Sequence, residues 1–110
     1  MLVVNFNKHL DDTRMRMLMD DVGPDACVTT IACDFNWNLP LRPQVRWVKE
    51  KLYVLIQHHS ARRADAMVPP IGPQETMIVM ALIRQHQRSW PSVIYFLDDK
   101  VHSIPLDAWS

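Results

Sequence analysis

Three short stretches of this 110-residue chain carry side chains that suit ligand binding. They are residues 5–9 (NFNKH), 34–38 (DFNWN) and 68–76 (VPPIGPQET). Each contains or follows the end of an apolar run that is typical of a buried strand. Because parallel strands end at the same edge of a sheet, we expect these stretches to meet at one ligand site.

The proline-rich stretch is the most unusual of the three. Its adjacent prolines stop a strand abruptly, and Gly72 allows the backbone to approach a ligand closely. A helix follows, and the free N–H groups and positive dipole at a helix start favour an anion such as phosphate. The first residues of this helix are Gln74, Glu75 and Thr76. We therefore predict a rigid phosphate-binding turn, with a simple tight connection as the alternative.

The other two stretches offer side chains that suit a nucleotide. Trp37 can stack on a base, and the amides of Asn7 and Asn36 can pair with base or ribose edges. His9 is the best-placed general acid or base, since histidine exchanges protons near neutral pH. The plainer interpretations are that Trp37 anchors the core and that His9 is a capping or surface residue.

Residue types and spacing argue against several other chemistries. The two cysteines, Cys27 and Cys33, do not have the spacing of a zinc site, and the chain has neither a Walker pattern nor GxGxxG. Asparagines stand after the first strand, where a metal-dependent nuclease needs carboxylates. We therefore expect no metal and no cofactor. If both cysteines lie in one strand, their even separation places them on the same face as buried thiols.

Strands and helices alternate along the chain. The predicted strands are residues 1–6, 26–35, 65–68 and 92–97, with a further edge strand at 101–106. The predicted helices run from an N-cap at Asp11 or Asp12 to Gly23, from 43 to about 59, and from 76 to 88. This order favours an α/β fold. We expect one small Rossmann-like domain over residues 1–110, with a mainly parallel sheet of four or five strands and about three helices.

The helix predicted over 76–88 is apolar almost all round at its start. The apolar residues are Met77, Ile78, Met80, Ala81, Leu82 and Ile83. A helix with this pattern is expected to be buried on more than one side, against the sheet and against a partner chain.

The overall charge limits the choice of partners. Lys and Arg together number 12, as do Asp and Glu, so the formal net charge is zero. A basic stripe for long DNA or RNA is absent from the sequence. The chain also has no apolar run of roughly 18 residues for a membrane span and no signal-peptide pattern at residues 1–10. We therefore expect a cytoplasmic protein.

Three segments together resemble a known family. They are MLVVNFNKHL at residues 1–10, the loop, PQV and helix at 42–56, and VPPIGPQETMIVMALIRQHQRSWPSVIYFLDD at 68–99. These segments are similar to minimal CARF-like proteins, small accessory proteins of type III CRISPR loci that are grouped with the ring nucleases. The resemblance covers most of the chain.

The resemblance implies a ligand and an assembly. The ligand is a cyclic oligoadenylate RNA, above all cyclic tetra-adenylate, the second messenger of type III CRISPR antiviral defence. The assembly is a homodimer, with a possible higher assembly, in which the ligand lies across the two-fold axis. The binding residues that the resemblance implies are Asn7, Lys8, His9, Gly72, Gln74, Glu75 and Thr76.

Binding has two possible outcomes. A ring nuclease would align the ribose 2′-hydroxyl with the neighbouring phosphate without a metal, and His9 would be its general acid or base. A sequestering protein would only lower the free messenger concentration. One histidine without an acid–base partner favours sequestration or slow cleavage over efficient turnover. A homodimeric interaction module without a nucleotide and an enzyme acting on a mononucleotide are the rival interpretations.

Overall fold

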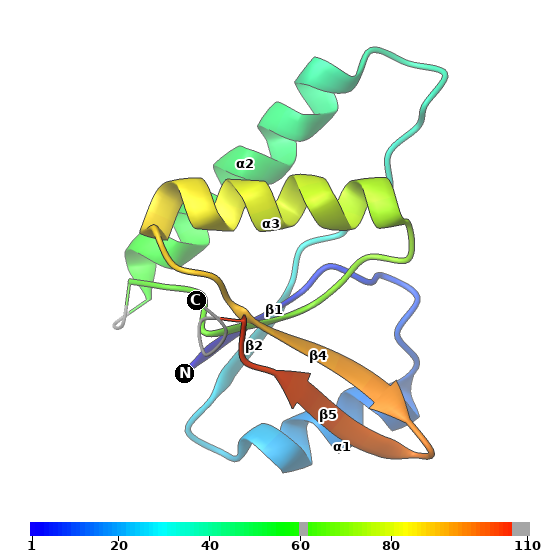
Figure 1. Ribbon diagram of the computed structural model, residues 1–110, viewed down its shortest axis with the longest axis vertical. Coiled ribbons are helices and arrows are strands. Elements are labelled where there is room, and N and C mark those ends of the chain that lie inside the picture. Colours follow the sequence, from blue (N-terminus) through cyan, green and yellow to red (C-terminus); the bar gives the residue numbers. More distant parts are fainter. Residues whose placement is uncertain (60–61, 107–110) are drawn as a thin grey trace.

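A computed structural model describes residues 1–59 and 62–106 of the chain. Five strands form one sheet, and three helices pack on it (Figure 1). The elements are β1 (Leu2–Asn5), α1 (Asp12–Val22), β2 (Cys27–Thr30), α2 (Leu41–His58), β3 (Ala66–Val68), α3 (Pro73–Gln87), β4 (Ser92–Leu97) and β5 (Lys100–Ile104). The predicted α/β class, with a mainly parallel sheet and three helices, is confirmed.

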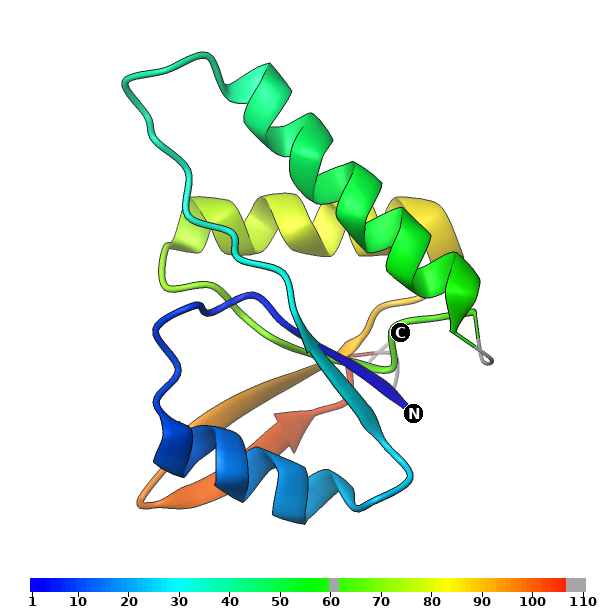
Figure 2. The ribbon, with the colours of Figure 1, turned by 180° about the vertical axis from the view of Figure 1, so that it is seen from behind.

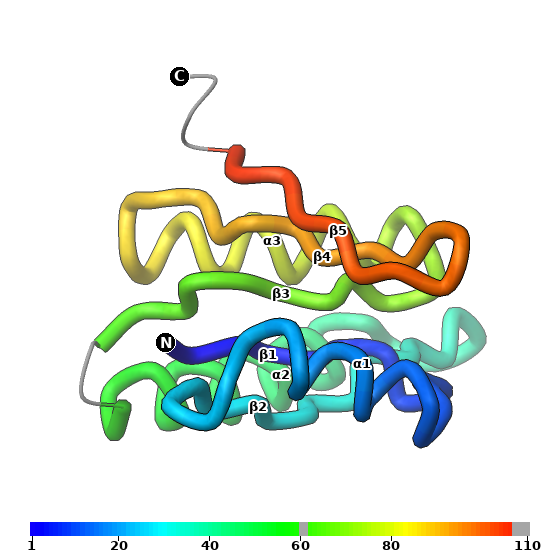
Figure 3. The backbone as a smooth tube through the Cα atoms, turned by 90° about the horizontal axis from the view of Figure 1, so that it is seen from below, coloured from blue at the N-terminus to red at the C-terminus, as the bar shows by residue number. Residues whose placement is uncertain are grey.

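The strand order explains where a ligand site belongs. The order is β2-β1-β3-β4-β5, and every neighbouring pair is parallel except β4 with β5 (Figure 3). The chain moves from β1 to β2 at one edge and then crosses back to β3 on the other side of β1. Ligands of such sheets bind beyond the carboxyl ends of the strands at this reversal.

The helices divide between the two faces of the sheet. Figures 1 and 2 show α2 and α3 together on one face and α1 on the other. Alternate residues of β1 therefore enter different cores, because successive side chains of a strand point to opposite faces. Leu2 and Val4 pack in the core that α2 and α3 cover, whereas Val3 packs in the core on the α1 side.

The boundaries of α1 agree with the predicted caps. The Asp11 carboxylate accepts a hydrogen bond from the N–H of Arg14 at 2.7 Å, which satisfies one free donor of the first turn. At the other end, Gly23 has a φ of 87°, and its N–H donates to the carbonyl of Met19. Glycine suits this position because side chains disfavour positive φ.

The prediction for the second strand is wrong in its length. The strand was predicted over 26–35, but β2 ends at Thr30. The ladder ends there because its partner β1 ends at Asn5, which pairs with Thr30. The chain then follows the β1 loop, where the N–H of Cys33 donates to the carbonyl of Phe6. Cys27 is exposed and Cys33 is buried, so the prediction of two buried thiols on one strand face is also wrong.

The helix predicted from residue 76 begins earlier, at Pro73, which is a favoured first residue because it needs no N–H partner. Val79, Leu82 and Ile83 of α3 are buried, but Met77 is 72% exposed. The prediction that this helix is buried on more than one side agrees with its packing against the sheet and α2, while the predicted burial against a partner chain stays a prediction. Across residues 1–59 and 62–106, no helix is long and apolar enough to cross a membrane.

Candidate functional site

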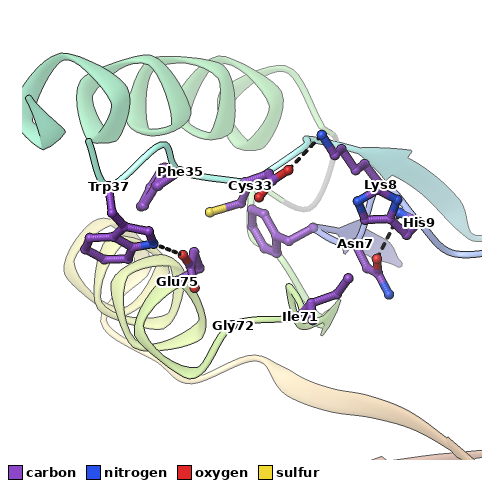
Figure 4. Close-up of a pocket in the computed structure, with 11 residues that line it drawn as sticks. Asn7, Lys8, His9, Cys33, Phe35, Trp37, Ile71, Gly72 and Glu75 are labelled. Atoms are coloured by element: carbon purple, nitrogen blue, oxygen red, sulfur yellow. Dashed lines mark hydrogen bonds and ion pairs between the residues drawn. The ribbon is translucent and has the colours of Figure 1, made fainter. Parts of the chain in front are cut away.

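The three polar stretches meet at one hollow, which we call the carboxyl-edge pocket (Figure 4). Its volume is about 260 Å³. The lining residues are Phe6, Asn7, Lys8 and His9 after β1, Cys33, Asp34, Phe35 and Trp37 after β2, and Ile71, Gly72 and Glu75 between β3 and the first turn of α3. The predicted meeting of the three stretches at the carboxyl edge of the sheet is confirmed.

Most of the predicted ligand residues line this pocket, and three do not. Those in the lining are Asn7, Lys8, His9, Trp37, Gly72 and Glu75. Outside it, the Thr76 hydroxyl donates to the carbonyls of Gly72 at 2.9 Å and Pro70 at 3.3 Å, so it braces the turn. The backbone N–H and the carbonyl of Asn36 are both bonded to the Gln44 side chain. Gln74 is exposed at the start of α3.

The β1 loop is shaped by a buried amide that the sequence interpretation left without a role. Asn5 is 1% exposed. Its Oδ1 accepts the N–H of Asn7 at 3.0 Å, while its Nδ2 donates to the carbonyl of Asn7 at 3.1 Å and to Thr30 Oγ1 at 3.2 Å. Asn7 Oδ1 in turn accepts the N–H of His9 at 2.9 Å. Buried amides with several partners hold a unique conformation, so Lys8 and His9 are presented on a fixed turn.

A second network fixes the opposite wall of the pocket. Trp37 Nε1 donates to Glu75 Oε1 at 2.8 Å, and Glu75 is 7% exposed. The Glu75 carboxyl group folds back over Gly72, where a Cβ atom would overlap it. Gly72 is the N-cap of α3 and Glu75 stands three residues later. The spacing matches that of a capping box, a signal that predicts a backward-turned glutamate from sequence alone.

This arrangement bears on the phosphate-binding turn predicted at the start of α3. A carboxylate near a helix N-terminus already interacts favourably with the helix dipole. A phosphate placed beside Gly72 would meet the negative charge of Glu75, and like charges repel strongly where water is excluded. The part of the pocket beside Glu75 therefore suits a hydrogen-bond donor better than a second anion.

The positive charge of the pocket is also partly neutralised. Lys8 Nζ lies 2.8 Å from Asp34 Oδ2, and both side chains are about half exposed. The hydrogen bond and the charge of Lys8 lower the pKa of the Asp34 carboxyl, and the nearby His9 adds to this effect. With histidine neutral, the lining thus carries one cation, Lys8, against two carboxylates, Asp34 and Glu75.

Cys33 is an inert part of the pocket wall. Burial, together with the nearby charges of Glu75 and Asp34, raises the pKa of its thiol to about 12. The thiolate is the reactive form of a cysteine. At neutral pH, iodoacetamide should therefore label the exposed Cys27, and its reaction with the buried Cys33 should be slower by a factor of roughly one hundred at least. Peptide mass spectrometry measures both rates. In urea both thiols should react. Equal labelling rates for Cys27 and Cys33 in the native protein would contradict the burial of Cys33.

The fold and the pocket together define a small Rossmann-like chain with a candidate ligand site at the carboxyl edge of its sheet. In the described part of the chain, no three or more His, Cys, Asp or Glu side chains gather where they could hold a metal ion. A scan against protein-family models, a search of curated proteins and a search of solved structures found no match to this chain. Its function is therefore argued from the pocket and from the resemblance described above.

Proposed function

We propose that this protein binds cyclic tetra-adenylate and damps type III CRISPR signalling by sequestering it or cleaving it slowly. The observation that carries the proposal is the convergence of three polar loops on one pocket at the point where strand order reverses. Rigid walls favour binding, because little conformational entropy is then lost when a ligand is held. The resemblance to minimal CARF-like proteins supplies the identity of the ligand.

The size of the pocket is consistent with a ligand shared between two copies. At about 260 Å³ it is smaller than the roughly 300–1,000 Å³ of most small-molecule sites, so it suits part of a four-nucleotide ring rather than the whole ring. Two copies related by a two-fold axis offer the same pocket twice, which matches a ligand built from repeated units. Trp37 and Ile71 line the pocket with 51% and 72% of their surfaces exposed, and a ligand or a partner copy would cover them.

The placement of His9 favours sequestration over rapid cleavage. Its imidazole is exposed at the rim of the pocket. In residues 1–59 and 62–106, no other side chain hydrogen-bonds this ring, so nothing orients it as a general acid or base. Lys8, the nearest cation along the chain, is paired with Asp34.

A single experiment separates the possible outcomes. Purified protein in molar excess is mixed with labelled cyclic tetra-adenylate at neutral pH with EDTA, the bound fraction is measured, and the ligand is chromatographed after denaturation. Intact bound ligand supports sequestration. Linear products with 2′,3′-cyclic phosphate ends support metal-independent cleavage. The absence of any binding would remove this ligand from consideration.

Two tryptophans of similar exposure provide a matched pair for the binding assay. Trp37 lines the pocket, whereas Trp47 lies on α2 outside it and is 49% exposed. Replacing Trp37 with alanine should weaken binding by roughly 10- to 100-fold, because stacking on an aromatic ring contributes about 1–3 kcal/mol per base. Trp47→Ala should leave the affinity unchanged. Equal losses in the two variants would argue against base stacking on Trp37.

A homodimeric interaction module without a nucleotide ligand is the second candidate. The exposed apolar side chains of Trp37, Ile71 and Met77 favour it, because clusters of such residues often mark protein contacts. Sedimentation without nucleotide tests this candidate. A dimer that Trp37→Ala dissociates, together with no binding of cyclic tetra-adenylate, would support it.

Competition by AMP or ATP for a bound messenger would instead indicate a mononucleotide site.

A further inference from the structure

We propose that the carboxyl-edge pocket takes the adenine base of the ligand, with Glu75 accepting a hydrogen bond from the exocyclic amine and the phosphates outside near Lys8. This inference rests on the proposed function and specifies which part of the ligand enters the pocket. It differs from the arrangement that the sequence predicts, in which a phosphate occupies the start of α3.

Glu75 has an acceptor oxygen to spare. Oε1 accepts the indole N–H of Trp37 at 2.8 Å, whereas Oε2 lies over Gly72 and accepts no hydrogen bond from the described residues. The residue is 7% exposed and lines the pocket. No buried side-chain oxygen of the described residues lacks a hydrogen-bond partner, so Oε2 is open to solvent in the pocket. A ligand that brings an N–H group to it replaces water with a hydrogen bond to a charged acceptor and so gains affinity.

The orientation of Glu75 is fixed before a ligand arrives. Figure 4 shows its carboxyl group turned toward Trp37, with Gly72 beside it. The indole holds one oxygen, and the missing side chain at Gly72 leaves room for the other. A preorganised acceptor discriminates between ligands better than a mobile one, because it cannot turn away when the donor is missing.

The remaining walls suit a flat aromatic ring. The ring centroids of Phe35 and Trp37 lie 6.2 Å apart with an interplanar angle of 74°, an edge-to-face contact that holds the indole in place. Phe6 and Ile71 add apolar surface to the lining. Aromatic and apolar walls with a few well-placed polar groups are typical of sites that bind a heterocyclic base by stacking and by a hydrogen-bonded edge.

Charge places the phosphates outside. A phosphate inside the pocket would approach Glu75, whereas at the rim it would meet Lys8, whose side chain is 44% exposed. Lys8 can leave Asp34 and pair with a phosphate at little cost in free energy, because exposed ion pairs are weak. The base therefore enters the pocket and the phosphate replaces Asp34 as the partner of Lys8.

The test compares cyclic tetra-adenylate with a ring in which every adenine is replaced by purine, which lacks the exocyclic amine. We expect the wild-type protein to bind the purine ring roughly tenfold more weakly or worse, in line with the loss of a hydrogen bond to a charged group. In Glu75→Gln the amide oxygen accepts the indole N–H of Trp37, and the amide nitrogen that remains can only donate. It cannot accept a hydrogen bond from the exocyclic amine, so this variant should bind the adenine ring and the purine ring equally. Glu50→Gln on the exposed side of α2 is the control and should keep the full difference.

Each result is decisive for the inference. Equal wild-type affinity for the two rings would overturn the base-reading role and leave the proposed function in place. A full preference retained by Glu75→Gln would overturn the role of Glu75. If neither ring binds the wild-type protein, the inference falls together with the proposed function. The wild-type comparison decides even if Glu75→Gln does not fold.

Discussion

Replacing Asn5 with alanine should lower the free energy of unfolding by about 3 kcal/mol, because three hydrogen bonds are lost and each contributes about 0.5–1.5 kcal/mol. The amide of Asn5 bonds both backbone groups of Asn7 and the hydroxyl of Thr30. Of these groups, the carbonyl of Asn7 keeps one other donor, the N–H of Leu10 at 3.2 Å. The loss should appear as a lower midpoint in urea unfolding followed by circular dichroism.

Asn38 provides the matched control for this experiment. It is exposed, and only its backbone N–H makes a hydrogen bond, to Asn36 Oδ1. Asn38→Ala should therefore change the unfolding free energy by no more than about 0.5 kcal/mol, as surface substitutions usually do. If Asn5→Ala costs no more than Asn38→Ala, the amide of Asn5 does not organise the β1 loop. A real loss should be accompanied by weaker ligand binding, because Lys8 and His9 extend from this loop.

Gly72→Ala should destabilise the wild-type protein by about 1–2 kcal/mol, the cost of breaking a hydrogen bond to a charged group that is only partly replaced by water. Gly72 has φ −81° and ψ 141°, a conformation that any residue adopts, so the backbone itself does not oppose alanine. The nearest obstacle is the Glu75 carboxyl group, which the new Cβ would displace from Trp37.

The same substitution should lose its effect in a Glu75→Ala background. With the carboxyl group removed, alanine at position 72 restricts the unfolded chain, a gain of about 0.4–1 kcal/mol that is offset because alanine suits an N-cap less well than glycine. The four variants form a double-mutant cycle, measured by urea unfolding. The indole N–H resonance of Trp37 reports the bond directly and should shift in Gly72→Ala. A destabilisation that persists without Glu75 would contradict this account.

The elements of the fold were predictable because they rest on local patterns. The apolar run before Asn5 and the β-branched residues at 28–31 indicate strands, and the i, i+3, i+4 spacing from Met15 indicates a helix. The caps at Asp11 and Gly23 fix the ends of α1 for equally local reasons. The position of the site followed from the order of the elements, since parallel strands end at one edge.

What the sequence left open depends on residues far apart in the chain. The carboxylate of Glu75 meets the indole of a residue 38 positions earlier. Lys8, a ligand residue that the resemblance implies, pairs with Asp34 across two neighbouring loops. Neither contact has a period or a spacing that a local pattern can detect, and both change which chemical group the pocket accepts.

The amino-acid sequence by itself therefore determined the α/β class, the order of strands and helices, and the edge at which the three loops meet. Tertiary structure alone decided where β2 ends, that Cys33 turns inward, and that the indole of Trp37 holds Glu75 at the pocket. The physical reason is that hydrophobic periodicity acts over a few residues, whereas the charge and shape of a site arise from side chains that only folding brings together.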